Sequence, residues 1–117
     1  MAFDERLGDR MRDALSATRE ISEKRMFGGL CFLWRGKMFA GILGDELLLR
    51  IGPERQPSAL LQPHVRVMDF TGKPMKGYIY VGPEAIDADA ALEQWLQEAL
   101  AFTQSLPEAK VRPGRRS

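Results

Sequence analysis

The sequence has very few of the side chains from which metal centres and disulfide frameworks are built. Cys31 and His64 are the only cysteine and the only histidine among 117 residues. A single cysteine excludes an intramolecular disulfide, and one Cys with one His is too small a set for the clusters that hold zinc or iron. We therefore expect no metal and no cofactor, and a reducing, cytoplasmic compartment.

Long apolar runs are missing as well. The first residues, MAFDERLGDRMRD, carry acids and arginines where a signal peptide needs an apolar core, and no run approaches the ~20 apolar residues that cross a bilayer. Charge of one sign is not in excess either, because 17 Lys and Arg balance 16 Asp and Glu. The sequence thus predicts a protein without a membrane segment and excludes a uniformly basic nucleic-acid binder.

The charges that are present are unevenly placed. Residues 107–117 hold four cations against the single acid Glu108, namely Lys110, Arg112, Arg115 and Arg116. Residues 84–98, in contrast, hold acids and no Lys or Arg. We expect residues 1–106 to form one domain and residues 107–117 to be a basic, disordered tail.

Apolar periodicity predicts the helices. Phe3, Leu7, Met11 and Leu15 recur every four residues and predict a helix over about residues 3–18. A longer stripe predicts a helix from an N-cap at Asp87 to about residue 106, and a short helix is expected at about 54–62.

Short apolar runs between turn residues predict the strands. Their expected ranges are 30–35, 37–43, 46–52, 65–70 and 78–81, with residues 71–77 as a loop. The resulting order, α-β-β-β-α-β-β-α, predicts an α+β, two-layer domain in which helices pack on a five-stranded antiparallel sheet.

No catalytic constellation can be recognised, so we expect the protein not to be an enzyme. A nucleophilic pair of Cys31 and His64 is one alternative. However, Cys31 lies between Leu30 and Phe32 in an expected strand, which is typical of a small core residue.

The segment TGKPMKG, residues 71–77, is the first candidate interaction site. Its lysines and glycines would suit an anion held by backbone N–H groups, although an ordinary strand connection has the same composition. Asp69 before it could act as an acid or base, together with Lys73 and His64 in a small-molecule site, or could cap the turn. The candidate residues are Asp69, Gly72, Lys73, Pro74, Met75, Lys76 and Gly77.

The second candidate site is the entry to the first expected strand. It consists of Arg25, Met26, Phe27, Gly28 and Gly29. The two glycines lack the Lys-Ser/Thr and the helix that complete a phosphate loop. Glycine before a strand instead predicts a bend or a close backbone approach, with Phe27 packed on the core.

Two further sets of side chains could bind partners. Arg66, with Lys73, Lys76 and the tail residues Arg112, Arg115 and Arg116, could contact nucleic acid, although so few cations would bind weakly. Four methionines could form an adaptable binding surface, but methionine in alternating strands is more often core filler. These methionines are Met26, Met38, Met68 and Met75.

Two stretches of the sequence resemble the N-terminal domain of the TfoX/Sxy competence regulators. The first, KRMFGGLCFLWRGKMFAGILGDELLLRIG, covers residues 24–52, and the second, MDFTGKPMKGYIYVGPEAI, covers residues 68–86. The resemblance extends over about residues 8–104. It implies an α+β domain with an antiparallel sheet and a link to the regulation of DNA uptake in bacteria. The family provides no catalytic residues, and its full-length regulators carry a second domain that does not follow here.

We therefore expect a non-enzymatic regulatory or protein-interaction module that binds a protein partner, for example a transcription-related factor. Its expected working surfaces are residues 71–77, residues 25–29 and a sheet edge. An open sheet also predicts a homodimer. The alternatives are a weak nucleic-acid binder and a binder of small anions or metabolites.

Overall fold

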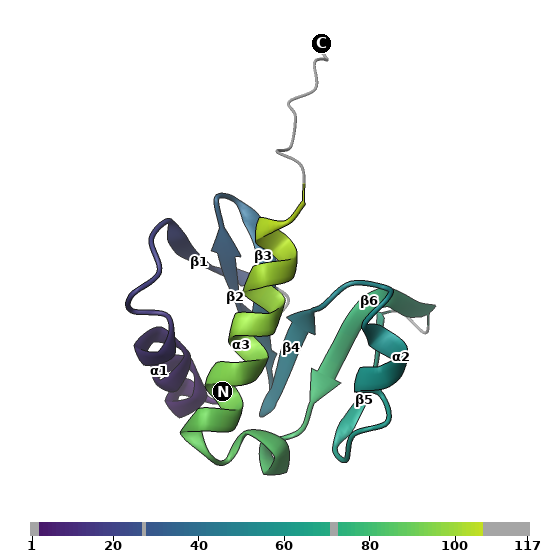
Figure 1. The fold of residues 1–117 in the computed structure, drawn as a ribbon. Coiled ribbons are helices and arrows are strands. Elements are labelled where there is room, and N and C mark those ends of the chain that lie inside the picture. The colour runs from purple at the N-terminus through teal and green to yellow at the C-terminus, as the bar shows by residue number, and fades with distance from the viewer. Residues whose placement is uncertain (1–2, 27, 71–72, 107–117) are drawn as a thin grey trace.

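The computed structural model describes residues 3–26, 28–70 and 73–106, and for Phe70, Lys73 and Pro74 it describes the backbone alone (Figure 1). Residues 27, 71–72 and 107–117 lie outside the description, and with them the predictions for Phe27, Gly72 and the basic tail. Ten elements follow one another: α1 (Glu5–Ala14), β1 (Ile21–Met26), β2 (Gly29–Trp34), β3 (Lys37–Leu43), β4 (Glu46–Arg50), α2 (Gln56–Ala59), β5 (Val65–Phe70), β6 (Lys73–Val81), the 3-10 helix η1 (Pro83–Ile86) and α3 (Asp89–Gln104).

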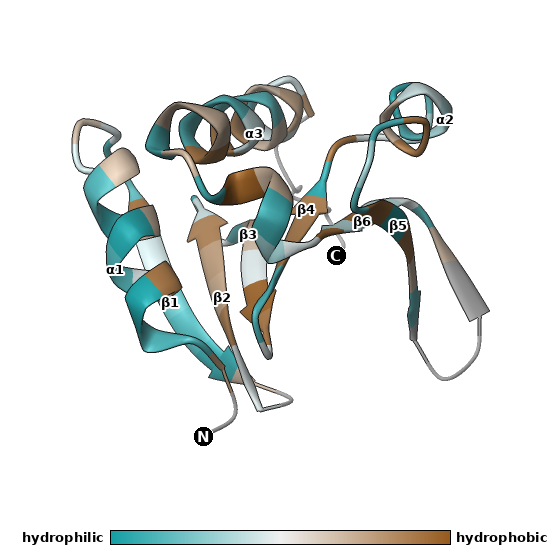
Figure 2. Ribbon diagram, turned by 90° about the horizontal axis from the view of Figure 1, so that it is seen from below, coloured by the Kyte–Doolittle hydropathy of each residue, from teal (hydrophilic) through white to brown (hydrophobic). Residues whose placement is uncertain are grey.

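The strands form one six-stranded sheet in the order β1-β2-β3-β4-β6-β5, and every neighbouring pair is antiparallel. Every described helix lies on the same side of this sheet, so no described helix covers the opposite face (Figure 2). The predicted α+β architecture with an antiparallel sheet is therefore confirmed.

The main core lies between the sheet and α3, which crosses β3 and β4. Phe32, Phe39 and Leu49 come from the sheet and Leu96 and Ala99 from α3, and each of these five side chains is completely buried. Core residues such as Leu47 and Leu49 lie two apart along a strand, and Leu96 and Ala99 lie three apart along the helix, which places them on facing surfaces.

The expectation of five strands is wrong, because β1 is a sixth. Its sequence, ISEKRM, is mostly charged and mostly exposed, so it lacks the apolar alternation on which strand prediction depends. β1 is nevertheless a true edge strand, in register with β2 from Ile21 opposite Trp34 to Met26 opposite Gly29. Charged side chains on an edge strand discourage pairing with other molecules, which explains this composition.

The start of α1 is fixed by a side-chain cap that the sequence analysis did not assign. Asp4 Oδ1 accepts hydrogen bonds from the backbone N–H groups of Arg6 at 2.9 Å and Leu7 at 3.3 Å. These are two of the donors that the first turn of a helix leaves without a partner.

We predict that Asp4→Ala lowers the free energy of unfolding by about 1 kcal/mol, because it removes this cap. Asp4→Asn keeps a side-chain oxygen and should lose less than half as much. Chemical denaturation of both variants measures the difference. Equal losses for Ala and Asn would show that the cap hydrogen bonds do not stabilise α1.

The predicted N-cap of the last helix is wrong. Asp87 has helical backbone angles as the residue that ends η1, so Ala88 is the N-cap of α3. Arg10 of α1 fastens this junction: its guanidinium donates to the carbonyl oxygens of Ile86 at 2.6 Å and Asp87 at 3.2 Å, and to Asp89 Oδ1 at 3.0 Å. The corner between η1 and α3 is therefore held by α1 rather than by a local cap.

The predicted loop over residues 71–77 is mostly strand, because β6 already begins at Lys73. The first half of β6 pairs with β5 alone, because β4 pairs with β6 only from Tyr78 to Val81. Proline has no backbone N–H group to donate. Pro74 is tolerated in this half of β6 because one side of the strand has no neighbouring strand that would need this donor. The prediction is wrong because Gly and Pro, which commonly mark loops, lie here within a strand.

Gly77 marks the bend between the two halves of β6. Its φ of 88° is in the left-handed region, and its carbonyl oxygen accepts from the N–H groups of Ile51 at 2.9 Å and Gly52 at 3.1 Å. Gln56 of α2 holds the same bend, since its Nε2 donates to the carbonyl oxygens of Met75 and Tyr78. Gly77, a candidate site residue, therefore has a structural function: it bends β6 within the β5–β6 hairpin.

Candidate functional site

The helix-free face of the sheet carries a second, smaller cluster of apolar side chains. Leu48, Met68 and Tyr80 are its buried members, and Met38, Leu43 and Tyr78 pack around them. These residues alternate along their strands with the residues of the main core, so they point to the opposite face of the sheet. No helix among the described elements covers them (Figure 2).

Within this cluster the face is hollowed. The hollow has a volume of about 210 Å³, and its surface is almost entirely carbon and sulfur. It is lined by Met26, Gly29, Leu30, Cys31, Met38, Ile42, Leu43, Leu48, Met68, Met75, Tyr78 and Tyr80. We call it the methionine hollow.

The methionine hollow brings together residues from both candidate segments of the sequence. Met26 and Gly29 come from residues 25–29, and Met75 comes from residues 71–77. The four methionines that were interpreted mainly as core filler all line it. The sequence does contain a signal for this hollow: Met38 and Met68 occupy strand positions that point away from the main core.

A row of cross-strand partners forms the floor of the methionine hollow. Cys31 lies opposite Gly41, Gly41 opposite Leu48, and Leu48 opposite Tyr80. A Cβ atom on Gly41 would come within 3.7 Å of the Cys31 Sγ, which places the missing side chain of Gly41 on this face. Because Gly41 has no side chain, the floor of the methionine hollow is recessed in the middle of the row.

The two adjacent glycines at the start of β2, Gly28 before it and Gly29 as its first residue, behave as predicted. Gly28 has a φ of 76°, and a Cβ atom on Gly29 would lie 2.3 Å from the carbonyl oxygen of Ile42. The first value is the expected bend, and the second is a close backbone approach that only glycine permits. Both predictions for this pair are confirmed, and Gly29 lies at the edge of the methionine hollow.

A family model described as TfoX N-terminal domain matches residues 13–103. The chain belongs to this family. The match contains all six strands, so every residue that lines the methionine hollow lies inside it. No curated protein and no solved structure matches the chain.

Charged groups surround the methionine hollow of this TfoX N-terminal domain. The Arg66 guanidinium binds the Glu46 carboxylate through contacts of 2.5 and 3.1 Å and lies 4.4 Å from the centre of the Tyr80 ring. Burial raises the pKa of the Tyr80 hydroxyl, which is therefore neutral near pH 7. Arg66, a candidate nucleic-acid contact, thus has its charge offset by Glu46.

Cys31 lies on the floor of the methionine hollow, and its side chain is buried. Burial raises the pKa of its thiol above the ordinary value, while the neighbouring Lys24 lowers that pKa in part. The thiol is therefore protonated at neutral pH and a poor nucleophile. This fits a packing function and not the nucleophilic pair with His64.

We predict that iodoacetamide alkylates Cys31 in the folded protein at least about tenfold more slowly than in the denatured chain at pH 8, because the thiolate is the reacting form. The midpoint of the rate against pH should lie above that of the denatured chain. Mass spectrometry of timed aliquots measures both. A midpoint at or below that of the denatured chain would contradict the assignment.

The residues proposed for a small-molecule site do not converge. His64 immediately precedes β5 and Asp69 lies near the end of that strand, so five residues of extended chain, or about 16 Å, separate them. Asp69 is in register with Pro74, within a strand pair and not at a turn. The side chain of Lys73 is outside the description, so its predicted part in the site is not decided.

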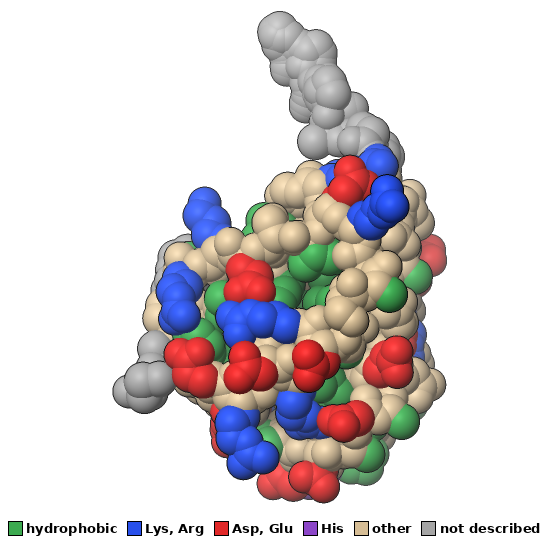
Figure 3. Space-filling model, turned by 90° about the vertical axis from the view of Figure 1, so that its left-hand side faces the viewer, with side chains coloured by type: hydrophobic (Ala, Val, Ile, Leu, Met, Phe, Trp, Pro, Cys, Tyr) green, Lys and Arg blue, Asp and Glu red, His purple; other side chains and the backbone are tan. Residues whose placement is uncertain are grey.

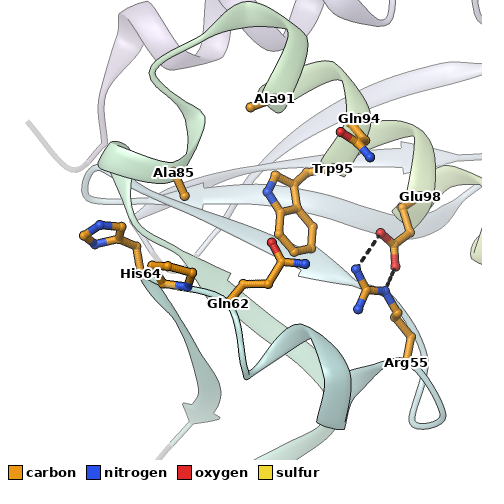
Figure 4. Close-up of a pocket in the computed structure, with 9 residues that line it drawn as sticks. Arg55, Gln62, His64, Ala85, Ala91, Gln94, Trp95 and Glu98 are labelled. Carbon is orange, nitrogen blue, oxygen red and sulfur yellow. Dashed lines mark hydrogen bonds and ion pairs between the residues drawn. The ribbon is translucent and has the colours of Figure 1, made fainter.

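His64 instead borders a second hollow of about 430 Å³ on the helix side, between the α2–β5 segment and α3 (Figure 4). Its main charged groups already bind each other, because Arg55 donates to both carboxylate oxygens of Glu98. The same guanidinium lies 5.8 Å from the centre of the Trp95 ring. This ion pair holds α3 against the α2 segment. It also neutralises the charge of Arg55, which is then not available to an anionic ligand.

The surface around α1 and β1 carries Lys and Arg interspersed with Asp and Glu (Figure 3). Arg12 binds Glu23 at 2.7 Å and Asp9 at 2.8 Å, and Arg25 lies 3.9 Å from Glu5. Mixed signs do not form the one-sided basic patch that nucleic-acid binding needs. Arg25 of the strand entry is engaged in the same network and lies 5.0 Å from the centre of the Phe3 ring.

No described helix is both long enough and apolar enough to cross a membrane. Among the described residues, no group of three or more His, Cys, Asp or Glu side chains is arranged to hold a metal ion.

Proposed function

We propose that this TfoX N-terminal domain is a non-enzymatic interaction module that binds a protein partner through the helix-free face of its sheet. The observation that carries the proposal is the methionine hollow: an apolar, concave surface lined by four methionines, which no described helix covers. Methionine side chains are flexible and polarisable, and they are enriched where one surface must adapt to a partner.

The size of the hollow favours a protein partner over a metabolite. Its volume of about 210 Å³ is below the roughly 300 to 1,000 Å³ typical of small-molecule pockets. A hollow of this size suits one or two apolar side chains of a larger partner. Exposed apolar side chains at its rim, such as Met75 with 37% of its surface accessible, would be buried in such a complex.

Family membership supports a regulatory process for this interaction. The resemblance to competence regulators implies a link to the regulation of DNA uptake, so we propose a transcription-related protein as the partner. On this proposal the domain contributes binding and no catalysis.

The test is affinity capture with the full chain as bait, using two variants that make the same kind of change at different surfaces. Met75→Asp puts a charge at the rim of the methionine hollow, and Leu61→Asp puts one at a side chain that is 86% exposed beyond α2. We expect a partner that the wild type and Leu61→Asp retain, that Met75→Asp loses at least about tenfold, and that nuclease treatment leaves in place.

Retention of the partner by Met75→Asp would contradict the proposal, as would loss of the partner after nuclease treatment. The second result would favour nucleic-acid bridging. Matching melting temperatures for the two variants are the control that each bait is folded.

Self-association stays a separate prediction. β1 and β5 are the edge strands of the open sheet and offer unpaired backbone groups. We predict a dimer at high concentration, which light scattering measures. A mass equal to one chain at the highest soluble concentration would contradict it.

A further inference from the structure

We propose that the helix-free face binds an acidic amphipathic helix, whose apolar side chains enter the methionine hollow and whose carboxylates lie near Lys24. This inference rests on the interaction function proposed above and names the chemistry of the partner.

The floor of the methionine hollow determines the backbone conformation of its occupant. β2, β3, β4 and the Tyr78–Val81 half of β6 are interior, so their N–H and C=O groups bind neighbouring strands and offer nothing to a segment lying on the face. An extended segment there would leave its own backbone groups unpaired above carbon and sulfur, at a cost of about 1 to 3 kcal/mol each. A helix satisfies its backbone internally and presents only side chains.

The register of the sheet gives the length of this helix. Lys24 lies opposite Cys31, and the floor row then runs through Gly41, Leu48 and Tyr80 to Arg66. Five interstrand steps of about 4.8 Å make a path of about 24 Å. At about 1.5 Å per residue, a helix of roughly 16 residues spans it. Two apolar residues one turn apart would lie over its low centre at Gly41.

The charges at the ends of the row give the sign of the partner. Lys24 is exposed and forms no ion pair with any described acid, and Arg50, opposite Tyr78, has none either. At the other end of the row Arg66 is offset by Glu46, and the Asp69 carboxylate also interacts electrostatically with Arg66 and Tyr80. The uncompensated positive charge therefore lies at Lys24 and Arg50. Carboxylates on a partner helix would be complementary to this positive charge.

The test is a selection of 16-residue segments from a random displayed library against the full chain. We expect binders with apolar residues at spacings of three and four, a net negative charge, and a gain of helical circular dichroism on binding. Binding to Met75→Asp should fall at least about tenfold. Lys24→Glu should weaken it about threefold to tenfold, while Arg19→Glu, the same charge reversal on the α1–β1 connection, should have no effect.

The possible results separate this inference from the proposed function. Binders that are basic, extended, or insensitive to Lys24→Glu but lost with Met75→Asp would overturn the acidic helix and leave the interaction function standing. Binders that Met75→Asp does not weaken would overturn both, since the hollow would not be the site. A selection that yields no segment binding below about 100 μM would count against the acidic helix, because complementary charge and apolar burial together should exceed that affinity.

Discussion

Gly29→Ala is expected to lower the free energy of unfolding by about 3 kcal/mol. The new Cβ atom would lie 2.3 Å from the carbonyl oxygen of Ile42. Neither group can move aside cheaply, because both belong to the backbone of paired strands β2 and β3. Thermal and chemical unfolding measure the loss.

Gly36→Ala is the matched control. Gly36 has a φ of 80°, but nothing lies within 4 Å of an added Cβ atom. Its cost is the conformational strain alone, about 1 kcal/mol. If Gly29→Ala were no more destabilising than Gly36→Ala, the close approach of β2 and β3 at this point would be wrong, and with it the explanation of the glycine pair.

Leu49→Ala is expected to lower the free energy of unfolding by about 4 kcal/mol, and Leu48→Ala by only about 2 kcal/mol. The two residues are neighbours in β4, with 0% and 7% of their surfaces exposed. Leu49 packs in the main core beneath α3, where truncation leaves a closed cavity. Leu48 faces the methionine hollow, so the space left by its truncation opens to solvent, and no described helix packs there.

The same two variants distinguish stability from binding. Leu48→Ala should weaken the binding of the segments selected on the helix-free face. Leu49→Ala should reduce this binding only by lowering the fraction of folded protein. Equal destabilisation by both, or a larger loss for Leu48→Ala, would mean that the two faces of the sheet are buried to the same extent.

Much of the fold follows from local patterns. Strands such as KMFAGIL and ELLLRIG were recognised because apolar residues lie between turn residues, and the last helix because its stripe is long. β1 was missed because an exposed edge strand has no buried face to leave an apolar pattern. The start of β6 was missed because Gly77 and Pro74 have strand-specific functions: a left-handed bend and a place on an unpaired strand side.

The candidate site was predictable in parts but not as a whole. Residues 25–29 and 71–77 stand out in the sequence for their glycines and cations, whereas they contribute Met26, Gly29 and Met75 to the methionine hollow. What joins them is the strand order, which places β6 beside β4 and so brings both segments to one face. Strand order depends on pairing between distant segments, which no local pattern contains.

The strand order also divides the folding of the chain into a fast and a slow part. β1 to β4 are successive neighbours with two residues between consecutive strands, so their pairing closes only short loops. The pairing of β4 with β6 joins Arg50 to Tyr78 and must close the whole intervening segment. Loop-closure entropy rises with that length, so formation of the β4–β6 pair should limit the folding rate. The methionine hollow, whose floor crosses this pair, is then among the last surfaces to be completed.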